Sequence, residues 1–374
     1  MKDNIPEIFK NKDLNVLITG GSGFIGSCLV RKLLKESKVN IFNLDKLSYS
    51  SDNTSIENTI KNLSKKIENK YFQYKVDLMN FERTNEIVQH ANPDLIFHFA
   101  AESHVDRSID NPKVFVENNI IGTLNLLESI RIHYEKLNKK RKNLFRLINI
   151  STDEVFGSLG ATGFFNESTR YDPTSPYSAS KGSADHLVNA WYHTYGIPVI
   201  TTNCSNNFGP WQFPEKLIPL TIIKALSHNT IPIYGNGKNI RDWLYVEDHI
   251  NALIKVSHIG KIGEKYCIGG FKEKTNLEIV ESICKKLDFI SPWDYSYKRL
   301  IKFVADRPGH DFRYAIDSKK ISEELSWKVN SSFSESLDKT ISWYINNQKW
   351  CWEVLKKGNY FGERIGLKSD NNKF

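Results

Sequence analysis

The sequence predicts an α/β fold built on a doubly wound parallel sheet. Apolar segments the length of one strand recur over the first 204 residues and alternate with segments of helical length. The first apolar segment leads directly into a cluster of glycines. Strands and helices that alternate in this way form βαβ units, in which helices cover both faces of a parallel sheet.

The predicted strands are continuous apolar runs, as expected for parallel strands buried on both faces. They cover residues 15–19, 40–44, 71–76, 94–98, 144–150 and 198–202. The predicted helices cover residues 24–36, 81–90, 112–134 and 176–195. The basic run 139–142 falls between a helix and a strand and is predicted to be a solvated loop.

The composition is that of an ordinary globular protein. Its 374 residues are 40% hydrophobic and 25% charged, which suggests two domains or one domain with an added lobe. No run approaches the roughly 18 apolar residues of a membrane span, and the first residues lack the apolar core of a signal peptide. Five cysteines without metal-type spacing indicate reduced thiols in a cytoplasmic protein, so neither a metal site nor a membrane partner is expected.

The formal net charge of +8 raises the question of an anionic partner. The basic residues do not form an extended patch in the sequence, so nucleic-acid binding is not expected. A mild positive field suits a phosphate-bearing small molecule instead.

A phosphate-binding loop follows the first strand. Gly20-Gly-Ser-Gly-Phe-Ile-Gly26 opens the first helix, so a pyrophosphate can approach the backbone at the helix N-terminus. Asp45 ends the second strand, nineteen residues after Gly26. A carboxylate there accepts hydrogen bonds from the ribose hydroxyls of NAD and repels the 2′-phosphate of NADP, and we expect Asp45 to outweigh the neighbouring Lys46.

These features predict a Rossmann-type domain that binds NAD over residues 14–203, preceded by a loose leader over residues 1–13. After residue 204 the pattern is irregular and richer in Pro, Gly and aromatic residues, which predicts a smaller α/β substrate-binding lobe over residues 204–350. Some of its segments, such as those around 241–258, are expected to return to the first domain. Residues 351–374 are predicted to be a C-terminal tail.

Two short motifs indicate the chemistry. Tyr177 and Lys181 lie four residues apart on one predicted helix face, where the ammonium can lower the phenol's pKa and make it a base. Asp153 and Glu154 end the fifth strand and exceed what alcohol oxidation needs. An acid and a base side by side suggest removal of water, and they require separated pKa values and therefore different burial.

Each motif has a simpler interpretation on its own. Thr-Asp-Glu after a strand is usually a helix N-cap with first-turn acids, and a Tyr and a Lys at this spacing usually form a surface pair. Their order behind a dinucleotide fingerprint favours an enzyme that oxidises, dehydrates and re-reduces one substrate.

Across residues 14–350 the chain resembles the extended short-chain dehydrogenase/reductases, and within them the dTDP-glucose 4,6-dehydratases. The matching motifs are Thr19-Gly-Gly-Ser-Gly-Phe-Ile-Gly-Ser27, Ala100-Ala-Glu-Ser-His-Val-Asp-Arg-Ser108, Ser151-Thr-Asp-Glu-Val155, Tyr177-Ser-Ala-Ser-Lys181, Asn203-Cys-Ser-Asn-Asn207, Phe213-Pro-Glu-Lys-Leu-Ile-Pro219, Arg241-Asp-Trp-Leu-Tyr-Val-Glu-Asp248 and Ala305-Asp-Arg-Pro-Gly-His-Asp311. The glycine motif fits the whole superfamily, whereas Thr-Asp-Glu together with Asp-Arg-Pro-Gly-His is far more specific.

The resemblance implies the catalytic roles. Tyr177 and Lys181 would take the proton from the sugar C4 hydroxyl as hydride leaves for a tightly bound NAD, with Thr152 bonded to the same oxygen. Glu154 would then remove the C5 proton while Asp153 protonates the departing C6 hydroxyl. Hydride would return to C6, so that a carbon–oxygen lyase converts dTDP-glucose to dTDP-4-keto-6-deoxyglucose and water.

Resemblance and strand position together assign the binding residues. Cofactor contacts are expected at Gly20, Gly23, Phe24, Ile25, Gly26, Asp45, Lys46, Leu47, Ser48, Asp77, Leu78, Phe99, Ala100, Ala101, Ser103, Asn118, Tyr177, Lys181 and Asn207. Substrate contacts are expected at Ser103, Thr152, Asn206, Lys216, Leu217, Pro232, Ile233, Tyr234, Arg241, Asn276, Asp306, Arg307, Pro308, Gly309 and His310. Arg241 can meet diphosphate oxygens bidentately; the alternative is a structural ion pair with Asp242 or Asp248.

The chain departs from the family pattern in three places. Phe156 stands where the family commonly has Tyr, and Asn118 where it often has Thr. The segment 158–171 is shorter than in many relatives. None of these changes touches the five catalytic candidates.

Other functions are also compatible with these motifs. A UDP-glucose 4,6-dehydratase would share the catalytic residues, and one methyl on the base is worth only about 1–3 kcal/mol in an apolar pocket. Asp153 and Glu154 count against a UDP-sugar 4-epimerase, and Asp45 against an NADP-dependent GDP-mannose 4,6-dehydratase. A UDP-glucuronate decarboxylase and a non-catalytic dinucleotide sensor are the remaining alternatives, and the complete catalytic set disfavours the sensor.

The resemblance also implies an assembly and a pathway. Relatives are homodimers paired through helices, for which 112–134 and 176–195 are the candidates. They supply rhamnose and other deoxysugars for surface polysaccharides.

Overall fold

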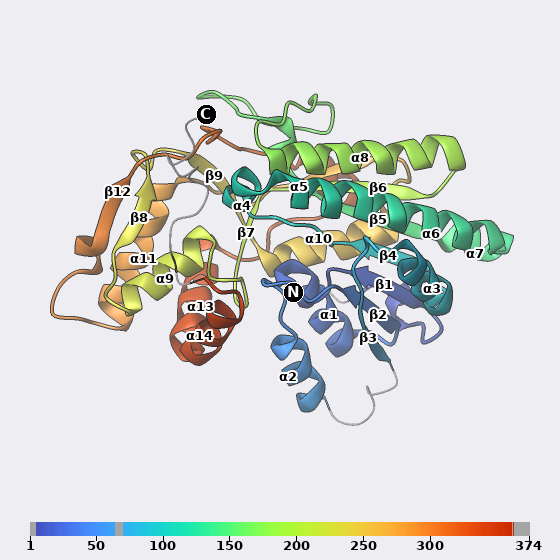
Figure 1. Cartoon of the computed structure of the whole chain (residues 1–374), viewed down its shortest axis with the longest axis horizontal. Coiled ribbons are helices and arrows are strands. Elements are labelled where there is room, and N and C mark those ends of the chain that lie inside the picture. Colours follow the sequence, from blue (N-terminus) through green and yellow to red (C-terminus); the bar gives the residue numbers. More distant parts are fainter. Residues whose placement is uncertain (1–4, 64–69, 361, 363–374) are drawn as a thin grey trace.

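The computed structural model describes residues 5–63, 70–360 and 362. Figure 1 shows a large sheet with its helices on one side of an elongated molecule and a smaller lobe on the other. The first six strands of the large sheet are β1 (Asn15–Thr19), β2 (Asn40–Asp45), β3 (Tyr71–Lys75), β4 (Leu95–His98), β5 (Arg146–Thr152) and β6 (Val199–Cys204). The seventh, β10 (Lys265–Ile268), comes from much later in the chain.

The sheet is doubly wound, as predicted. Its strand order is β10-β6-β5-β4-β1-β2-β3, and every pair is parallel. The chain runs from β1 outward to β3 and then returns to β4 on the other side of β1. The order therefore reverses between β1 and β4, and open α/β sheets bind their ligands beyond the carboxyl ends of the strands at such a point.

Helices cover both faces of this sheet (Figure 1). One face carries α1 (Phe24–Glu36), α2 (Thr54–Asn62), α10 (Val246–Ile259) and α12 (Lys319–Leu325), and the other carries α3 (Phe81–Ala91), α6 (Gly122–Lys136) and α8 (Pro176–Tyr195). Side chains alternate along β1, where Val16 and Ile18 join the first core and Leu17 joins the second. This alternation explains why the strands read as uninterrupted apolar runs.

The smaller lobe has two short sheets and its own core. Its strands are β7 (Asn206–Phe208), β8 (Ile231–Tyr234), β9 (Ile240–Tyr245), β11 (Glu273–Thr275) and β12 (Ile301–Val304). They pair as β11-β9-β7 and β12-β8. The helices are α9 (Leu217–Leu226), α11 (Asn276–Ile290), the short η5 (Tyr297–Leu300), α13 (Phe333–Asn346) and α14 (Gln348–Lys357). β10 is a strand of the large sheet, and α10 packs on one face of that sheet. The chain therefore returns to the large sheet after it has entered the smaller lobe.

In two segments the observed secondary structure differs from the prediction. The segment 112–134 is not one regular helix but α5 (Pro112–Phe115), a π-helical stretch η3 (Val116–Ile121) and then α6. The basic run is not a loop but α7 (Lys139–Leu144), which starts where the Asn138 side chain accepts from the Arg141 backbone N–H. Arg141 also pairs with Asp94 at 2.7 Å, so a contact distant in sequence fixes this turn as a helix.

The leader is packed rather than loose over its described residues. A 3-10 turn, η1 (Glu7–Lys10), places Phe9 fully inside the core of the large sheet. Ile5 and Phe9 are both buried in this core. Their spacing of four residues was the sequence signal for a packed segment, and the polar residues around them concealed it. Residues 1–4 lie outside the described part of the chain.

The predicted tail is also packed over its described part. Cys351, Val354 and Tyr360 are buried in the core of the smaller lobe. The Trp350 Nε1–H donates to Asp52 Oδ2 at 2.9 Å, and the Lys357 ammonium donates to the Ser51 carbonyl at 2.9 Å. Residues 361 and 363–374 lie outside the described part of the chain.

Within the described residues, no helix is both long and apolar enough to cross a membrane, and no group of three or more His, Cys, Asp or Glu side chains is arranged to hold a metal ion.

Candidate active site

The glycine loop brings β1 and α1 into close contact. Gly20 has φ +70°, a conformation that favours glycine, and its N–H donates to the Leu44 carbonyl at 2.8 Å. At Gly26 a Cβ atom would lie 2.3 Å from the Gly20 carbonyl oxygen. The two glycines therefore let the helix N-terminus face the carboxyl edge of the sheet at short range, as a pyrophosphate site requires.

Asp45 ends β2 beside this loop. Its Oδ2 accepts from the Ser22 N–H at 3.0 Å and its Oδ1 accepts from the Leu47 N–H at 2.7 Å. Burial raises the pKa of Asp45, while these hydrogen bonds oppose the rise. A ribose hydroxyl can still donate to a carboxylate held in this way, because each oxygen has a second lone pair.

Lys46, which follows Asp45, is paired with other groups. Its ammonium donates to Glu102 Oε1 at 2.6 Å and to Asn118 Oδ1 at 2.7 Å. The cation beside Asp45 is therefore neutralised by Glu102, and the negative charge of Asp45 dominates this end of the cavity.

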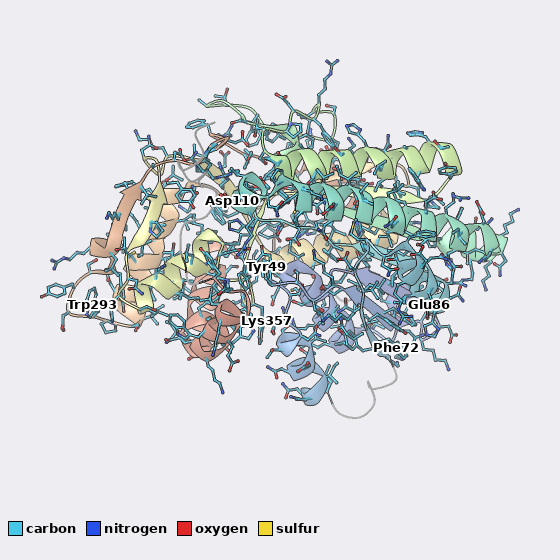
Figure 2. All side chains as sticks on the ribbon, in the orientation of Figure 1. Tyr49, Phe72, Glu86, Asp110, Trp293 and Lys357 are labelled. Atoms are coloured by element: carbon cyan, nitrogen blue, oxygen red, sulfur yellow. The ribbon has the colours of Figure 1, made fainter. Side chains whose placement is uncertain are left out.

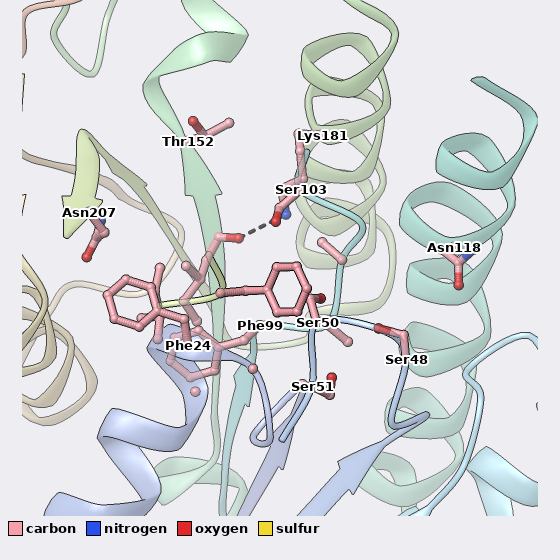
Figure 3. Close-up of a pocket in the computed structure, with 18 of the residues that line it drawn as sticks. Phe24, Ser48, Ser50, Ser51, Phe99, Ser103, Asn118, Thr152, Lys181 and Asn207 are labelled. Atoms are coloured by element: carbon pink, nitrogen blue, oxygen red, sulfur yellow. Dashed lines mark hydrogen bonds between the residues drawn. The ribbon is translucent and has the colours of Figure 1, made fainter. Parts of the chain in front are cut away.

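One cavity runs along the carboxyl edge of the large sheet (Figure 3). The predicted residues that line it are Gly20, Gly23, Phe24, Ile25, Gly26, Asp45, Lys46, Ser48, Asp77, Leu78, Phe99, Ala100, Ala101, Ser103, Asn118, Thr152, Asp153, Glu154, Tyr177, Lys181, Asn206, Asn207 and Lys216. Figure 3 shows Phe24, Ser48, Phe99, Asn118, Lys181 and Asn207 converging on it from separate elements. The cofactor candidates and the chemical candidates therefore share one space.

The two carboxylates stand where β5 passes into a 3-10 turn, η4 (Asp153–Phe156). Thr152 Oγ1 accepts from the Glu154 N–H at 3.3 Å and donates to Asp153 Oδ1 at 3.2 Å. Asp153 is 1% exposed, whereas Glu154 is half-buried. The predicted difference in burial is confirmed.

This difference separates the two groups chemically. Burial, and then the negative charge of Glu154, raises the pKa of Asp153 well above its ordinary value. Burial also raises the pKa of Glu154, but positive charges from Arg307, Lys216 and Arg241 oppose the rise. Asp153 is therefore suited to hold a proton and Glu154 to accept one.

Tyr177 and Lys181 lie on the first turns of α8. Ser175 and Ser178 form a capping box with Pro176 at the first helical position, which fixes where the helix begins. The Lys181 ammonium donates to the Ile150 carbonyl at 2.9 Å. Burial and the charge of Glu154 raise the pKa of Tyr177 well above its ordinary value, and a hydrogen bond with Thr152 opposes the rise. The protein alone thus keeps the phenol neutral.

The predicted substrate residues meet this site from the smaller lobe. The Lys216 ammonium donates to the Ser103 carbonyl at 2.8 Å. The buried Arg241 donates to the carbonyls of Asp311 and Phe312, at 3.0 and 3.4 Å, and lies over the Tyr314 ring.

The ion pair considered as an alternative for Arg241 does not form. Asp242 accepts from the backbone N–H groups of Gly270 and Lys272, and Asp248 from those of Asn330 and Ser331. The Arg241 charge is left facing the carboxylate pair, in agreement with its effect on Glu154.

The remaining predicted residues lie outside the lining of this cavity. They are Leu47, Leu217, Pro232, Ile233, Tyr234, Arg241, Asn276, Asp306, Arg307, Pro308, Gly309 and His310. Several approach α4 (Val105–Asp110): the Tyr234 hydroxyl donates to Asp106 Oδ2 at 2.9 Å, and Arg307 Nε lies 3.5 Å from Asp106 Oδ1. The pairing of β8 with β12 brings these residues together.

Several cavity residues escaped the sequence-based prediction. They are Leu44, Ser50, Ser51, Val76, Ile150, Ser151, Cys204, Ser205, Gln212, Phe213 and Glu215. Glu215 joins the two halves, because its carboxylate accepts from the Tyr49 hydroxyl and from Arg107 Nε, each at 2.9 Å. Figure 2 shows Tyr49 where the two halves meet. The signal available for Glu215 was its place beside Lys216 in the Phe-Pro-Glu-Lys motif.

The two substitutions relative to the family pattern are accommodated locally. Phe156 packs against Phe165 and Tyr171, with ring centroids 5.2 and 5.4 Å apart, so its position is apolar. Asn118 lies in the π-helical stretch and links Lys46 to the Val114 carbonyl.

The fold and the site define the class of extended short-chain dehydrogenase/reductases. They combine a doubly wound sheet, a glycine loop that opens into the cofactor cavity, and a tyrosine and a lysine one helical turn apart on the cavity wall. Comparison with known proteins narrows this class. The family model described as GDP-mannose 4,6 dehydratase matches residues 17–340. A dTDP-glucose 4,6-dehydratase of Salmonella typhimurium is 49% identical over 356 residues, 93% of this chain and 97% of the relative. The corresponding enzyme of Escherichia coli K12 is 48% identical with the same coverage.

Solved structures agree. DesIV, a dTDP-glucose 4,6-dehydratase of Streptomyces venezuelae crystallised with NAD, has a TM-score of 0.82 and 36% identity, covering 91% of this chain and 99% of that one. The dTDP-glucose 4,6-dehydratase of Bacillus anthracis in complex with NAD has a TM-score of 0.78 and 41% identity, covering 91% and 100%. The chain belongs to the dTDP-glucose 4,6-dehydratase family.

Proposed function

We propose that this protein is an NAD-dependent dTDP-glucose 4,6-dehydratase, a carbon–oxygen lyase that forms dTDP-4-keto-6-deoxyglucose and water. The observation that carries the proposal is the pair Asp153 and Glu154, adjacent in sequence but different in burial, on the wall of the cofactor cavity beside Tyr177. Oxidation alone would need only Tyr177 and Lys181. The relatives that share this function are 46–49% identical to the chain.

The cavity fits NAD. Gly20 and Gly26 leave room for a pyrophosphate where added Cβ atoms would meet backbone at 2.7 and 2.3 Å, and Asp45 supplies a carboxylate at the ribose position. Bound there, NAD supplies reversible hydride transfer, which oxidises C4 of the sugar first and reduces C6 last. Its positive ring would also help the Tyr177 phenol to ionise.

The protein groups then divide the proton transfers. Tyr177 takes the C4 hydroxyl proton, and Thr152, which both donates and accepts, hydrogen-bonds the same oxygen. Glu154 removes the C5 proton, made acidic by the adjacent ketone. Asp153 gives its proton to the leaving C6 hydroxyl; among the described residues its Oδ2 is buried without a hydrogen-bond partner.

Positive charge around the carboxylates supports a nucleoside diphosphate as the carrier of the sugar. Lys216, Arg241 and Arg307 all act on Glu154 electrostatically. Arg307 Nη1 is buried without a hydrogen-bond partner among the described residues, so it can still donate to a phosphate oxygen.

The deciding experiment uses sugar nucleotides deuterated at C4 and mass spectrometry of the product. We expect loss of one water with the label moved to C6, and a higher kcat/KM for dTDP-glucose than for UDP-glucose. The Tyr177→Phe variant should lose turnover by about 10²–10⁴ and still bind NAD. Epimerisation or decarboxylation without water loss would refute the roles given to Asp153 and Glu154, and preference for UDP-glucose would refute the substrate.

The proposal also includes the oligomeric state, the cellular compartment and the pathway of the enzyme. A homodimer paired through the 112–134 and 176–195 segments would be seen as twice the 43.1 kDa chain mass in light scattering. All five cysteines are buried free thiols, which supports a reducing cytoplasm. The 4-keto-6-deoxy product would serve deoxysugar synthesis, including rhamnose for polysaccharides.

A further inference from the structure

Among the residues that the structure describes, no carboxylate is hydrogen-bonded to the buried Lys181 ammonium. The residue is 5% exposed, and its hydrogen bond goes to the neutral carbonyl of Ile150. Removing an ammonium from water costs several kcal/mol unless charge compensates it. The burial of this charge therefore needs a cause elsewhere in the structure.

Asp185 lies one helical turn beyond Lys181 on the same face of α8 and is 3% exposed. Three donors hold its carboxylate: Asn149 Nδ2 at 2.7 Å, Ser151 Oγ at 2.6 Å and the Tyr171 hydroxyl at 2.9 Å. Asn149 and Ser151 flank Ile150 on β5, so one strand positions both charges. The three donated hydrogen bonds hold the Asp185 carboxylate in a fixed position beside β5.

Burial disfavours the charged forms of Cys204 and His98, two further titratable groups that interact with Lys181. Burial raises the pKa of the Cys204 thiol on β6 to about 12 and lowers the pKa of the His98 imidazole on β4 to about 3. Burial lowers the pKa of Lys181 itself, and the largest opposing influence is the charge of Asp185. Burial also raises the pKa of Tyr171, which keeps that hydroxyl a donor to the carboxylate.

We propose that Asp185 is the buried counter-ion of Lys181 and acts as a positioning residue for proton transfer at Tyr177. The Asn149, Ser151 and Tyr171 donors fix the Asp185 charge under the active site, where it keeps Lys181 an ammonium. The sequence shows only that Asp185 lies four residues after Lys181, whereas the donors to its carboxylate come from distant parts of the chain. The proposal rests on the function proposed above, because it concerns the base of that reaction.

The first test compares the Asp185→Asn variant with the wild-type protein. The rate of NAD reduction after a single addition of substrate is measured as a function of pH. Loss of a nearby opposite charge shifts a pKa by about 1–3 units. Without Asp185 the ammonium loses its proton at lower pH, so we expect the alkaline limb of the profile to move down by about one unit or more. Tyr171→Phe is the matched control: it removes one hydrogen bond but no charge, and its alkaline limb should stay in place.

If Asp185 has a purely structural role, Asp185→Asn and Tyr171→Phe should both lower the stability, and the alkaline limb of the pH profile should stay in place in both variants. That result would overturn the proposal. If wild-type protein lacks dehydratase activity, the proposed function fails independently of the Asp185 result.

A second test needs no turnover. In a double-mutant cycle with Lys181→Met, measured by urea unfolding, Asp185→Asn should lower the midpoint in the wild-type background but leave it equal or higher in the Lys181→Met background. Should Asp185→Asn alone fail to fold, the double variant should still fold, because it buries no charge. Additive effects, or failure of both variants to fold, would contradict the pairing.

Discussion

Asp153 shows how one residue can serve function at the expense of stability. Its side chain is 1% exposed, and burial beside Glu154 raises its pKa well above the ordinary value. A carboxyl group with a raised pKa holds the proton that the leaving hydroxyl needs. The same burial penalises the ionised form, so the native state is less stable wherever that form dominates in the unfolded chain.

We therefore expect Asp153→Asn to lower kcat by about 10²–10⁴ and to stabilise the fold at neutral pH. The stabilisation should vanish below the unfolded pKa of about 3.9, where the wild-type carboxyl group is neutral in both states. It should grow as the pH rises toward the raised native value. Urea unfolding across pH measures this difference, with Asp172→Asn, an exposed carboxylate nearby, as the control. A gain in stability that does not depend on pH would contradict the argument.

At the scale of elements, the connection from β1 to α1 depends on missing side chains. Gly26 lies in the first turn of α1, where a Cβ would lie 2.3 Å from the Gly20 carbonyl oxygen and 2.8 Å from the Gly21 Cα. Both neighbours are backbone atoms, so the turn cannot make room by rotating a side chain. The glycine pattern in the sequence thus encodes a close approach of helix and strand.

Gly26→Ala should cost about 1–3 kcal/mol of stability through overpacking and raise the Kd for NAD about tenfold or more. Thermal unfolding and fluorescence titration with NAD measure the two effects. Gly160→Ala is the matched control, because nothing lies within 4 Å of an added Cβ there. Equal NAD affinity in the two variants would show that the loop tolerates a side chain.

At the scale of the whole molecule, the two halves are held together around the cavity. Glu215 from the smaller lobe binds Tyr49 and Arg107 from the sheet half, and α14 binds Asp52 and Ser51 through Trp350 and Lys357. Ser51 lines the cofactor cavity. The C-terminal helix therefore supports the loop that follows Asp45.

Trp350→Ala should cost about 3–5 kcal/mol, since the ring is 8% exposed and packs on Trp211 and Trp343. It should also raise the Kd for NAD, because the loop at Ser51 loses its support. Trp352 on the same helix is 48% exposed, and Trp352→Ala should change stability by no more than about 0.5 kcal/mol. Chemical unfolding and NAD titration of both variants test this, and similar losses in the two would refute the assigned contact.

Much of the fold and of the candidate site could be predicted because its signals are local. The strand before Gly20, the spacing of Asp45 behind it and the four-residue spacing of Tyr177 and Lys181 depend only on the periods of strands and helices. Those periods hold wherever the segment lies. The doubly wound order of the sheet followed from the alternation of the same elements.

The tertiary structure decided what depends on contacts between distant residues. Phe9 belongs to the core because it packs among the buried side chains on one face of the large sheet. The basic run is a helix because Arg141 forms an ion pair with Asp94. The partners of Arg241 are the backbone carbonyls of Ile240, Asp311 and Phe312 rather than a neighbouring aspartate. The carboxylate that faces Lys181 is held by Asn149, 36 residues before it in the chain. Sequence alone determines which chemical groups the chain carries and at what local spacing, whereas packing decides which of them share a buried space and hence which charges are compensated.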